Sequence, residues 1–164
     1  MAIDRKVITS EFAANTNLFG YKPNTSVIPF EFAATDVDGS VLRILPNLPA
    51  EAVILDIQYC CDAMAGFTAM EIGLYHTLDG DMAGAVIDAN CFLASADPHA
   101  GVAISAKAGG MNAVDIANLG KKAYEFAGYT KSTNKWAAFD LAITGTTRGT
   151  ATGSMTVVVT WIQP

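Results

Sequence analysis

Histidine, cysteine and charged residues are scarce in this chain of 164 residues. Charged residues make up 16% of it, below the usual quarter for a globular domain, and it has 2 histidines and 3 cysteines. No run approaches the roughly 18 consecutive apolar residues of a membrane-spanning helix, so we expect no membrane segment. The charged start, Met1 to Lys6, is not followed by an apolar stretch. We therefore expect no signal peptide and synthesis in the cytoplasm.

Basic residues are too few and too scattered for a nucleic-acid-binding face. The net charge is −6, whereas phosphate recognition needs clustered Lys and Arg. The odd number of cysteines, without a secretory signal, argues against a disulfide framework. We interpret Cys60, Cys61 and Cys91 as small buried hydrophobic residues.

Short segments of alternating polarity are abundant. Side chains of alternating character are typical of a strand with one face buried. We expect strands over residues 28–32, 41–45, 53–59, 67–75, 137–144 and 155–162. The second should end at Pro46, and residues 86–111 show no clear pattern. Short strands separated by turns predict an all-β antiparallel sandwich or barrel.

Other segments fit turns and one helix. Residues 121–127 are compatible with a short helix, with Gly128 placed to cap its C-terminus. Asp36-Val37-Asp38-Gly39 is typical of a β-turn, because the later positions of a calcium-binding loop do not match. Residues 145–153, rich in Thr and Gly, predict a flexible hairpin tip.

The first segment lacks periodicity. We divide the chain into an extended arm, residues 1–25, and a sandwich domain, residues 26–164. The arm carries spaced apolar residues that could hold a neighbouring subunit or pack on their own domain. These candidate partner-binding residues are Phe12, Leu18, Phe19 and Tyr21.

Residues that could support catalysis are few. The most suggestive group is His76 with Asp79 and Asp81, which could hold a metal, although the spacing matches no zinc motif. We interpret it as an ordinary hairpin end and His99 as solvated. Trp136 and Trp161 could form a sugar-binding platform, but core packing fits their strand positions better. We therefore expect no enzymatic activity, no metal and no cofactor.

Several segments together resemble a known group of proteins. Val41-Leu42-Arg43-Ile44-Leu45-Pro46, a Leu-Pro-x-x-Ala-Val turn at 48–53, and Met70 to Tyr75 precede Leu119 to Gly128 and Ala151 to Val159. Over residues 40–162 this order is similar to the jelly-roll decoration, or cement, proteins of tailed phages.

The resemblance implies a function. Such proteins bind the outside of the phage head, bridge major capsid protein subunits and stabilise the shell against the pressure of packaged DNA. It implies a jelly-roll sandwich, a homo-oligomer (dimer or trimer) and a location on the virion surface. A receptor- or carbohydrate-binding head-fibre or tail module is the alternative.

Overall fold

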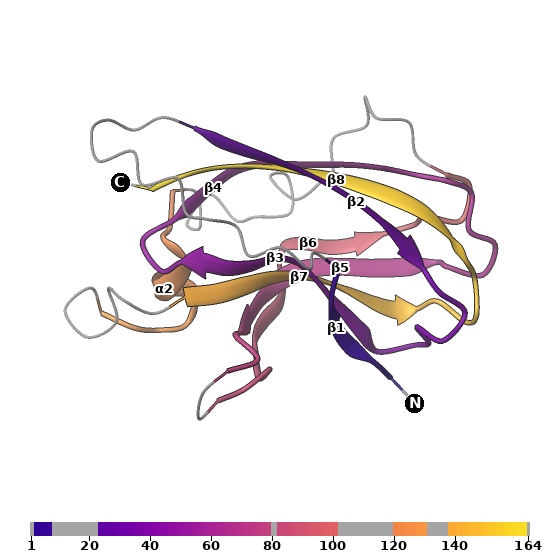
Figure 1. The fold of residues 1–164 in the computed structure, drawn as a ribbon, viewed down its shortest axis with the longest axis horizontal. Coiled ribbons are helices and arrows are strands. Elements are labelled where there is room, and N and C mark those ends of the chain that lie inside the picture. Colours follow the sequence, from indigo (N-terminus) through magenta and orange to yellow (C-terminus); the bar gives the residue numbers. More distant parts are fainter. Residues whose placement is uncertain (1, 8–22, 80–81, 102–119, 131–137, 164) are drawn as a thin grey trace.

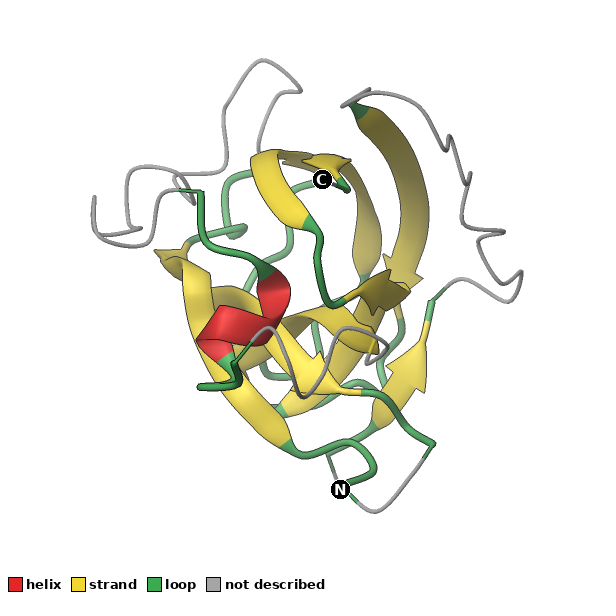
Figure 2. Ribbon diagram, turned by 90° about the vertical axis from the view of Figure 1, so that its left-hand side faces the viewer, coloured by secondary structure: helices red, strands yellow, loops and turns green. Residues whose placement is uncertain are grey.

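The computed structural model describes residues 2–7, 23–79, 82–101, 120–130 and 138–163. Within these ranges the protein is an all-β sandwich of two sheets with one short helix (Figures 1 and 2). No helix in them is long and apolar enough to cross a membrane. The elements are β1 (Asp4–Lys6), β2 (Asn24–Phe32), β3 (Ser40–Pro49), β4 (Val53–Cys61), β5 (Ala69–His76), β6 (Val86–Ala96), α2 (Ala123–Phe126), β7 (Ala138–Thr147) and β8 (Gly153–Ile162).

The strands pair in a nested order. The larger sheet has the order β1-β3-β7-β5-β6 and the smaller sheet β2-β8-β4. The strand β2 pairs with the last strand, β3 pairs with β7, and β5 pairs with β6. These pairs are antiparallel, and β1 lies parallel to β3. The nested antiparallel pairing is that of a jelly roll, so the expected fold class is confirmed.

The core lies between the two sheets. Leu42, Ile143 and Ile72 are in register across β3, β7 and β5, and all three are fully buried. Ile28 and Val157 form a matching row in the smaller sheet. The alternation of polarity in the sequence produces these rows, because every second side chain of a strand points to the same face.

Four sequence predictions need correction. Residues 4–6, assigned to the arm, form β1 within a sheet. β3 continues through Pro46 because irregular pairing and a positive φ at Asn47 accommodate the proline. β6 was not predicted, because its long exposed stretch lacks alternation. Residues 145–153 join the two sheets instead of closing a hairpin.

The short helix is confirmed. Gly128 adopts φ 70°, and its N–H donates to the carbonyl of Glu125 while the N–H of Tyr129 donates to the carbonyl of Tyr124. This pattern is a Schellman C-cap, which glycine adopts without steric cost. The helix N–H groups of Ala123 and Tyr124 donate to the turn between β3 and β4.

Gly73 is required by the path of β6 over β5. The residues on either side, Ile72 and Leu74, pair with Leu93 and Asp88, so β6 carries extra residues opposite Gly73. A Cβ on Gly73 would lie 2.0 Å from the carbonyl oxygen of Asp88.

We therefore expect Gly73→Ala to lower the free energy of unfolding by about 3 kcal/mol, because the backbone of β6 must move away. Gly149→Ala is the control: Gly149 has φ +61° and nothing within 4 Å, so the loss should be only about 1 kcal/mol. Urea denaturation of both variants measures this. Equal losses would contradict the assigned path of β6.

Candidate functional site

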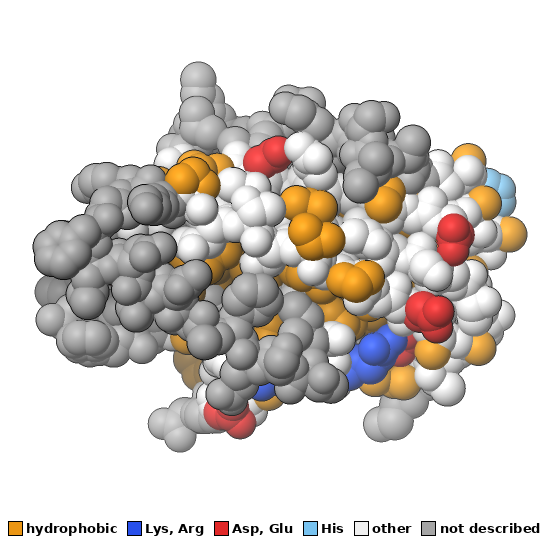
Figure 3. All heavy atoms as spheres, turned by 45° about the horizontal axis from the view of Figure 1, so that its top comes forward, with side chains coloured by type: hydrophobic (Ala, Val, Ile, Leu, Met, Phe, Trp, Pro, Cys, Tyr) orange, Lys and Arg blue, Asp and Glu red, His pale blue; other side chains and the backbone are white. Residues whose placement is uncertain are grey.

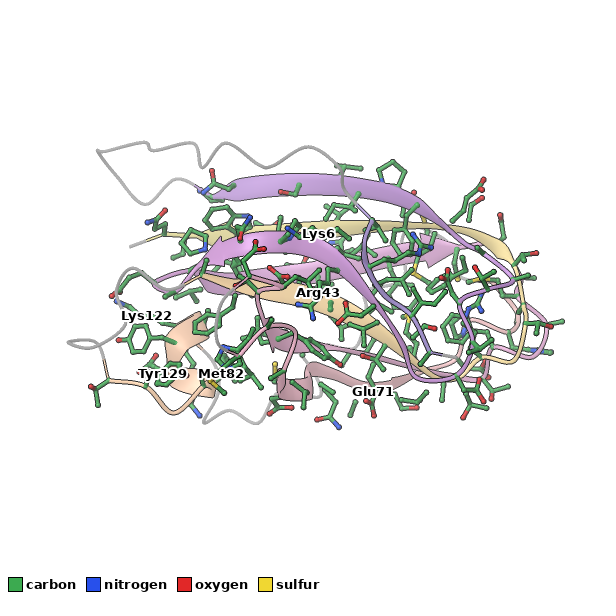
Figure 4. All side chains as sticks on the ribbon, turned by 60° about the horizontal axis from the view of Figure 1, so that its bottom comes forward. Lys6, Arg43, Glu71, Met82, Lys122 and Tyr129 are labelled. Atoms are coloured by element: carbon green, nitrogen blue, oxygen red, sulfur yellow. The ribbon has the colours of Figure 1, made fainter. Side chains whose placement is uncertain are left out.

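Arg43 is a fully buried cation in β3 whose donors are all used. Its Nε and Nη2 donate to the two oxygens of Asp4, each at 2.7 Å. Nη1 donates to Asp140 at 2.8 Å and to the carbonyl of His76 at 2.6 Å, and Nη2 also donates to the carbonyl of Gly84 at 3.2 Å. The side chain thus joins β1, β3, β7 and the loop between β5 and β6 (Figure 4).

The surroundings keep Arg43 charged. Burial would lower the pKa of Arg43, but its hydrogen bonds to Asp4 and Asp140 raise it above its ordinary value. The guanidinium carbon lies 5.4 Å from the ring centroid of Tyr75, and the Tyr75 hydroxyl bonds to Thr144 at 2.5 Å. A polar network therefore covers part of the outer face of the larger sheet.

A second ion pair of opposite direction anchors β1. Arg5 donates to both oxygens of Asp36, at 3.1 and 2.6 Å, and the N–H of Ala33 donates to Asp36 at 2.9 Å. Burial alone would raise the pKa of Asp36, but these hydrogen bonds and the charges of Arg5 and Arg148 hold it below its ordinary value. β1 thus presents an acid to a buried base and a base to a buried acid.

Arg148 is a buried cation that is incompletely paired. Its guanidinium carbon lies 5.1 Å from the ring centroid of Phe32 and 5.9 Å from that of Phe67, and its Nη2 donates to the carbonyl of Ala33 at 2.7 Å. Its Nε and Nη1 have no hydrogen-bond partner among the described residues. The backbone beside it is fixed, because the N–H of Arg148 donates to Asp38 at 2.6 Å. The predicted flexible tip is therefore an anchored connection.

An aromatic cluster lies below the hairpin of β5 and β6. The ring of His76 lies 5.9 Å from that of Phe139 and 6.3 Å from that of Tyr129. The Tyr129 hydroxyl contacts the sulfur of Met82 at 3.8 Å, and Figure 4 shows these two side chains together. Met82 and Val86 are 53% and 58% exposed, so the hairpin presents apolar side chains to solvent.

The outer face of the smaller sheet is broad and weakly charged (Figure 3). Alternate residues of β2, β8 and β4 point outward, and Val27, at 64% exposure, is the most exposed large hydrophobic residue among those described. In register across the strands lie Val27, Val158 and Gln58. Glu31 and Asp56 are the charged residues of this face among the outward positions of the three strands. Central depletion of charge is typical of protein–protein interfaces.

The residues proposed from the sequence have different outcomes. Phe12, Leu18, Phe19 and Tyr21 lie outside the described residues, so their predicted role stays a prediction. Asp81 also lies outside them, and the described residues contain no group of three side chains that could hold a metal. His76 packs against aromatic rings at the end of β5, as described above.

The minor predictions can be checked individually. His99 is exposed, and its Nδ1 accepts the N–H of Gly66 at 3.3 Å. Trp161, at 6% exposure, belongs to the core as expected, and Trp136 lies outside the described residues. Cys91 is buried, and burial raises the pKa of its thiol, whereas Cys60 and Cys61 are half-buried and not fully buried as predicted.

Sequence reasoning missed the ion pairs. The segment Met1 to Lys6 served only to test for a signal peptide, and Asp140 was placed on a polar strand face. The available signal was Arg43, a single charge within the apolar run Val41 to Leu45. A charge in such a run is rarely buried unless it is paired.

We expect Arg43→Met to lower the free energy of unfolding by about 3–5 kcal/mol, because Asp140 would remain buried without its cation. Asp4 is 35% exposed, so Asp4→Asn should cost less than about 1 kcal/mol. Chemical denaturation at neutral pH measures both values. A small loss for Arg43→Met would show that this network does not hold the sheet together.

Asp36 should make stability depend on acid pH. Its pKa is lowered on folding, so its contribution is complete above the ordinary value of 3.8 and is lost as the pH falls through the lowered pKa. We expect Asp36→Asn to be less stable at neutral pH and to lose less further stability on acidification than the unsubstituted protein. Asp79→Asn, which removes the same charge from an exposed turn, should retain the full acid sensitivity. Parallel pH profiles for all three proteins would contradict this.

Comparison with known proteins gives two structural likenesses. The chain matches no family model, and no curated protein matches its sequence. It superposes on a chain of the cyanophage Pam1 capsid asymmetric unit with a TM-score of 0.50 and 19% identity, covering 95% of each chain. A chain of the capsid of Ralstonia phage GP4 gives a TM-score of 0.49 and 9% identity, over 87% of this chain and 85% of that one. At 19% identity, the first likeness shows a shared fold.

Proposed function

We propose that the protein is a virion structural protein that binds the outside of a phage head and bridges major capsid protein subunits. The supporting observation is the fold likeness to a chain of the Pam1 capsid asymmetric unit, which covers 95% of both chains. Because the two chains agree over nearly their whole length, the likeness concerns the complete sandwich. The proposal assigns the protein a binding role without catalysis.

The surface of the smaller sheet fits this role. A protein that stabilises a shell needs a rigid scaffold and a face that can be buried against other subunits. The outward residues of β2, β8 and β4 provide that face, with Val27 near one edge and few charges. We assign this face to the capsid contact, with the protein acting as a dimer or trimer whose weak contacts add through multivalency.

The test uses heads of the phage that carries this gene, purified from a strain in which the gene is disrupted. We expect the purified protein to sediment with these heads, but not with unassembled major capsid protein, and to raise the temperature at which the heads release DNA. Failure to bind the heads would contradict the proposed function.

Two matched variants test the assigned face. Val27→Asp introduces a charge on the smaller sheet and should weaken head binding at least tenfold, about 1.4 kcal/mol. Val86→Asp places the same charge at a similarly exposed position, 58% against 64%, on the hairpin, and should bind normally. Normal binding by Val27→Asp would overturn the choice of face and leave the proposed function standing.

A further inference from the structure

β1 is held almost entirely by polar contacts. Its ladder with β3 pairs Asp4 to Lys6 with Val41 to Arg43. The N–H of Val41 donates to the carbonyl of Ile3 at 2.6 Å, and the N–H of Ile3 donates to the hydroxyl of Ser40 at 3.0 Å. The ion pairs with Arg43 and Asp36 complete the attachment. The strand is short and lies at the sheet edge, so few apolar contacts oppose its release.

The buried charges beneath β1 each have a second partner in the rest of the chain. Arg43 keeps Asp140 at 2.8 Å, and both side chains are 0% exposed. Asp36 interacts electrostatically with Arg148, which has two donor nitrogens without hydrogen-bond partners. Removal of β1 therefore leaves no isolated buried charge, which is the condition that makes the loss of an ion-pair partner costly. The binding slot for β1 can open without disrupting the sandwich.

An open slot would need an occupant with a specific sequence. Without β1, the edge of β3 presents unpaired N–H and C=O groups that favour pairing with another strand. The slot places an acid opposite Arg43 and, at the next residue, a base opposite Asp36. In this chain an acidic residue is followed directly by a basic one at Asp4-Arg5 and nowhere else. The matching occupant is therefore β1 of the same chain or of a second copy.

We propose that β1 is exchanged between copies: Asp4 to Lys6 of one copy pair with β3 of a second copy, with Asp4 on its Arg43 and Arg5 on its Asp36. The connection to β2, residues 8–23, can extend to about 50 Å. A domain of this length has a radius of gyration of about 15 Å, so the connection can reach a neighbour. Exchange of an identical element is a low-cost route to an oligomer, because each contact already exists within one copy.

This exchange concerns the protein in solution and does not rest on the proposed capsid function. The test uses full-length protein with a photo-crosslinking residue in place of Lys6, prepared in ordinary and ¹⁵N-labelled form. The two forms are mixed in denaturant, refolded together and irradiated. We expect an oligomer by mass measurement, and about half of the crosslinked β1–β3 peptide pairs should join one light and one heavy peptide.

A monomer, or an oligomer whose crosslinks join only peptides of the same label, would overturn the proposal. The same photo-crosslinking residue at Glu31, an exposed position of β2, is the control and should give no crosslinks to β3. The double variant Asp4→Asn and Arg5→Gln should retain cooperative unfolding while its mixed crosslinks fall at least fivefold. An unchanged yield of mixed crosslinks in this variant would show that the two ion pairs do not direct the exchange.

Discussion

The buried guanidinium of Arg43 connects more of this structure than any other side chain described above. Its hydrogen bonds reach β1, β7 and the backbone on both sides of the β5–β6 turn. A buried charge is tolerated only when its donors are satisfied, and Arg43 meets this condition with Asp4, Asp140 and two carbonyl groups. The position of each of these elements is therefore constrained by one side chain.

This constraint distinguishes the outer faces of the two sheets. On the larger sheet, Arg43, Asp140 and the neighbouring Tyr75 are buried, so part of that face is occupied by the protein's own polar network. On the smaller sheet, outward residues such as Val27 and Thr25 are exposed. The sandwich thus offers a broad, weakly charged face on one side, and this asymmetry underlies the proposed contact with a shell.

The regular part of the fold was predictable because it depends on a local pattern. Alternation such as that of Val53 to Tyr59 identifies strands with one buried face, and Gly128 identifies the helix end. β3 was cut short because a proline usually ends a strand, whereas here Asn47 adopts φ 59° and its N–H donates to Asp140 at 2.9 Å. That compensation comes from a residue far along the chain.

The interaction sites were less predictable for the same reason. Asp4 and Arg5 gain their significance only when β3 and the turn at Asp36 are brought beside them, which a local pattern cannot reveal. The candidate residues Phe12, Leu18, Phe19 and Tyr21 remain sequence predictions, because they lie outside the described residues. His76, the most suggestive residue for catalysis, packs against Tyr129 and Phe139.

The central claim is that this sandwich is a component of a phage head. Image reconstruction of heads with and without the protein tests it most directly. The account predicts difference density on the outer surface, located where neighbouring major capsid protein subunits meet, with the smaller sheet facing the shell. Absence of difference density from the head, or density confined to its interior or to the tail, would contradict the account.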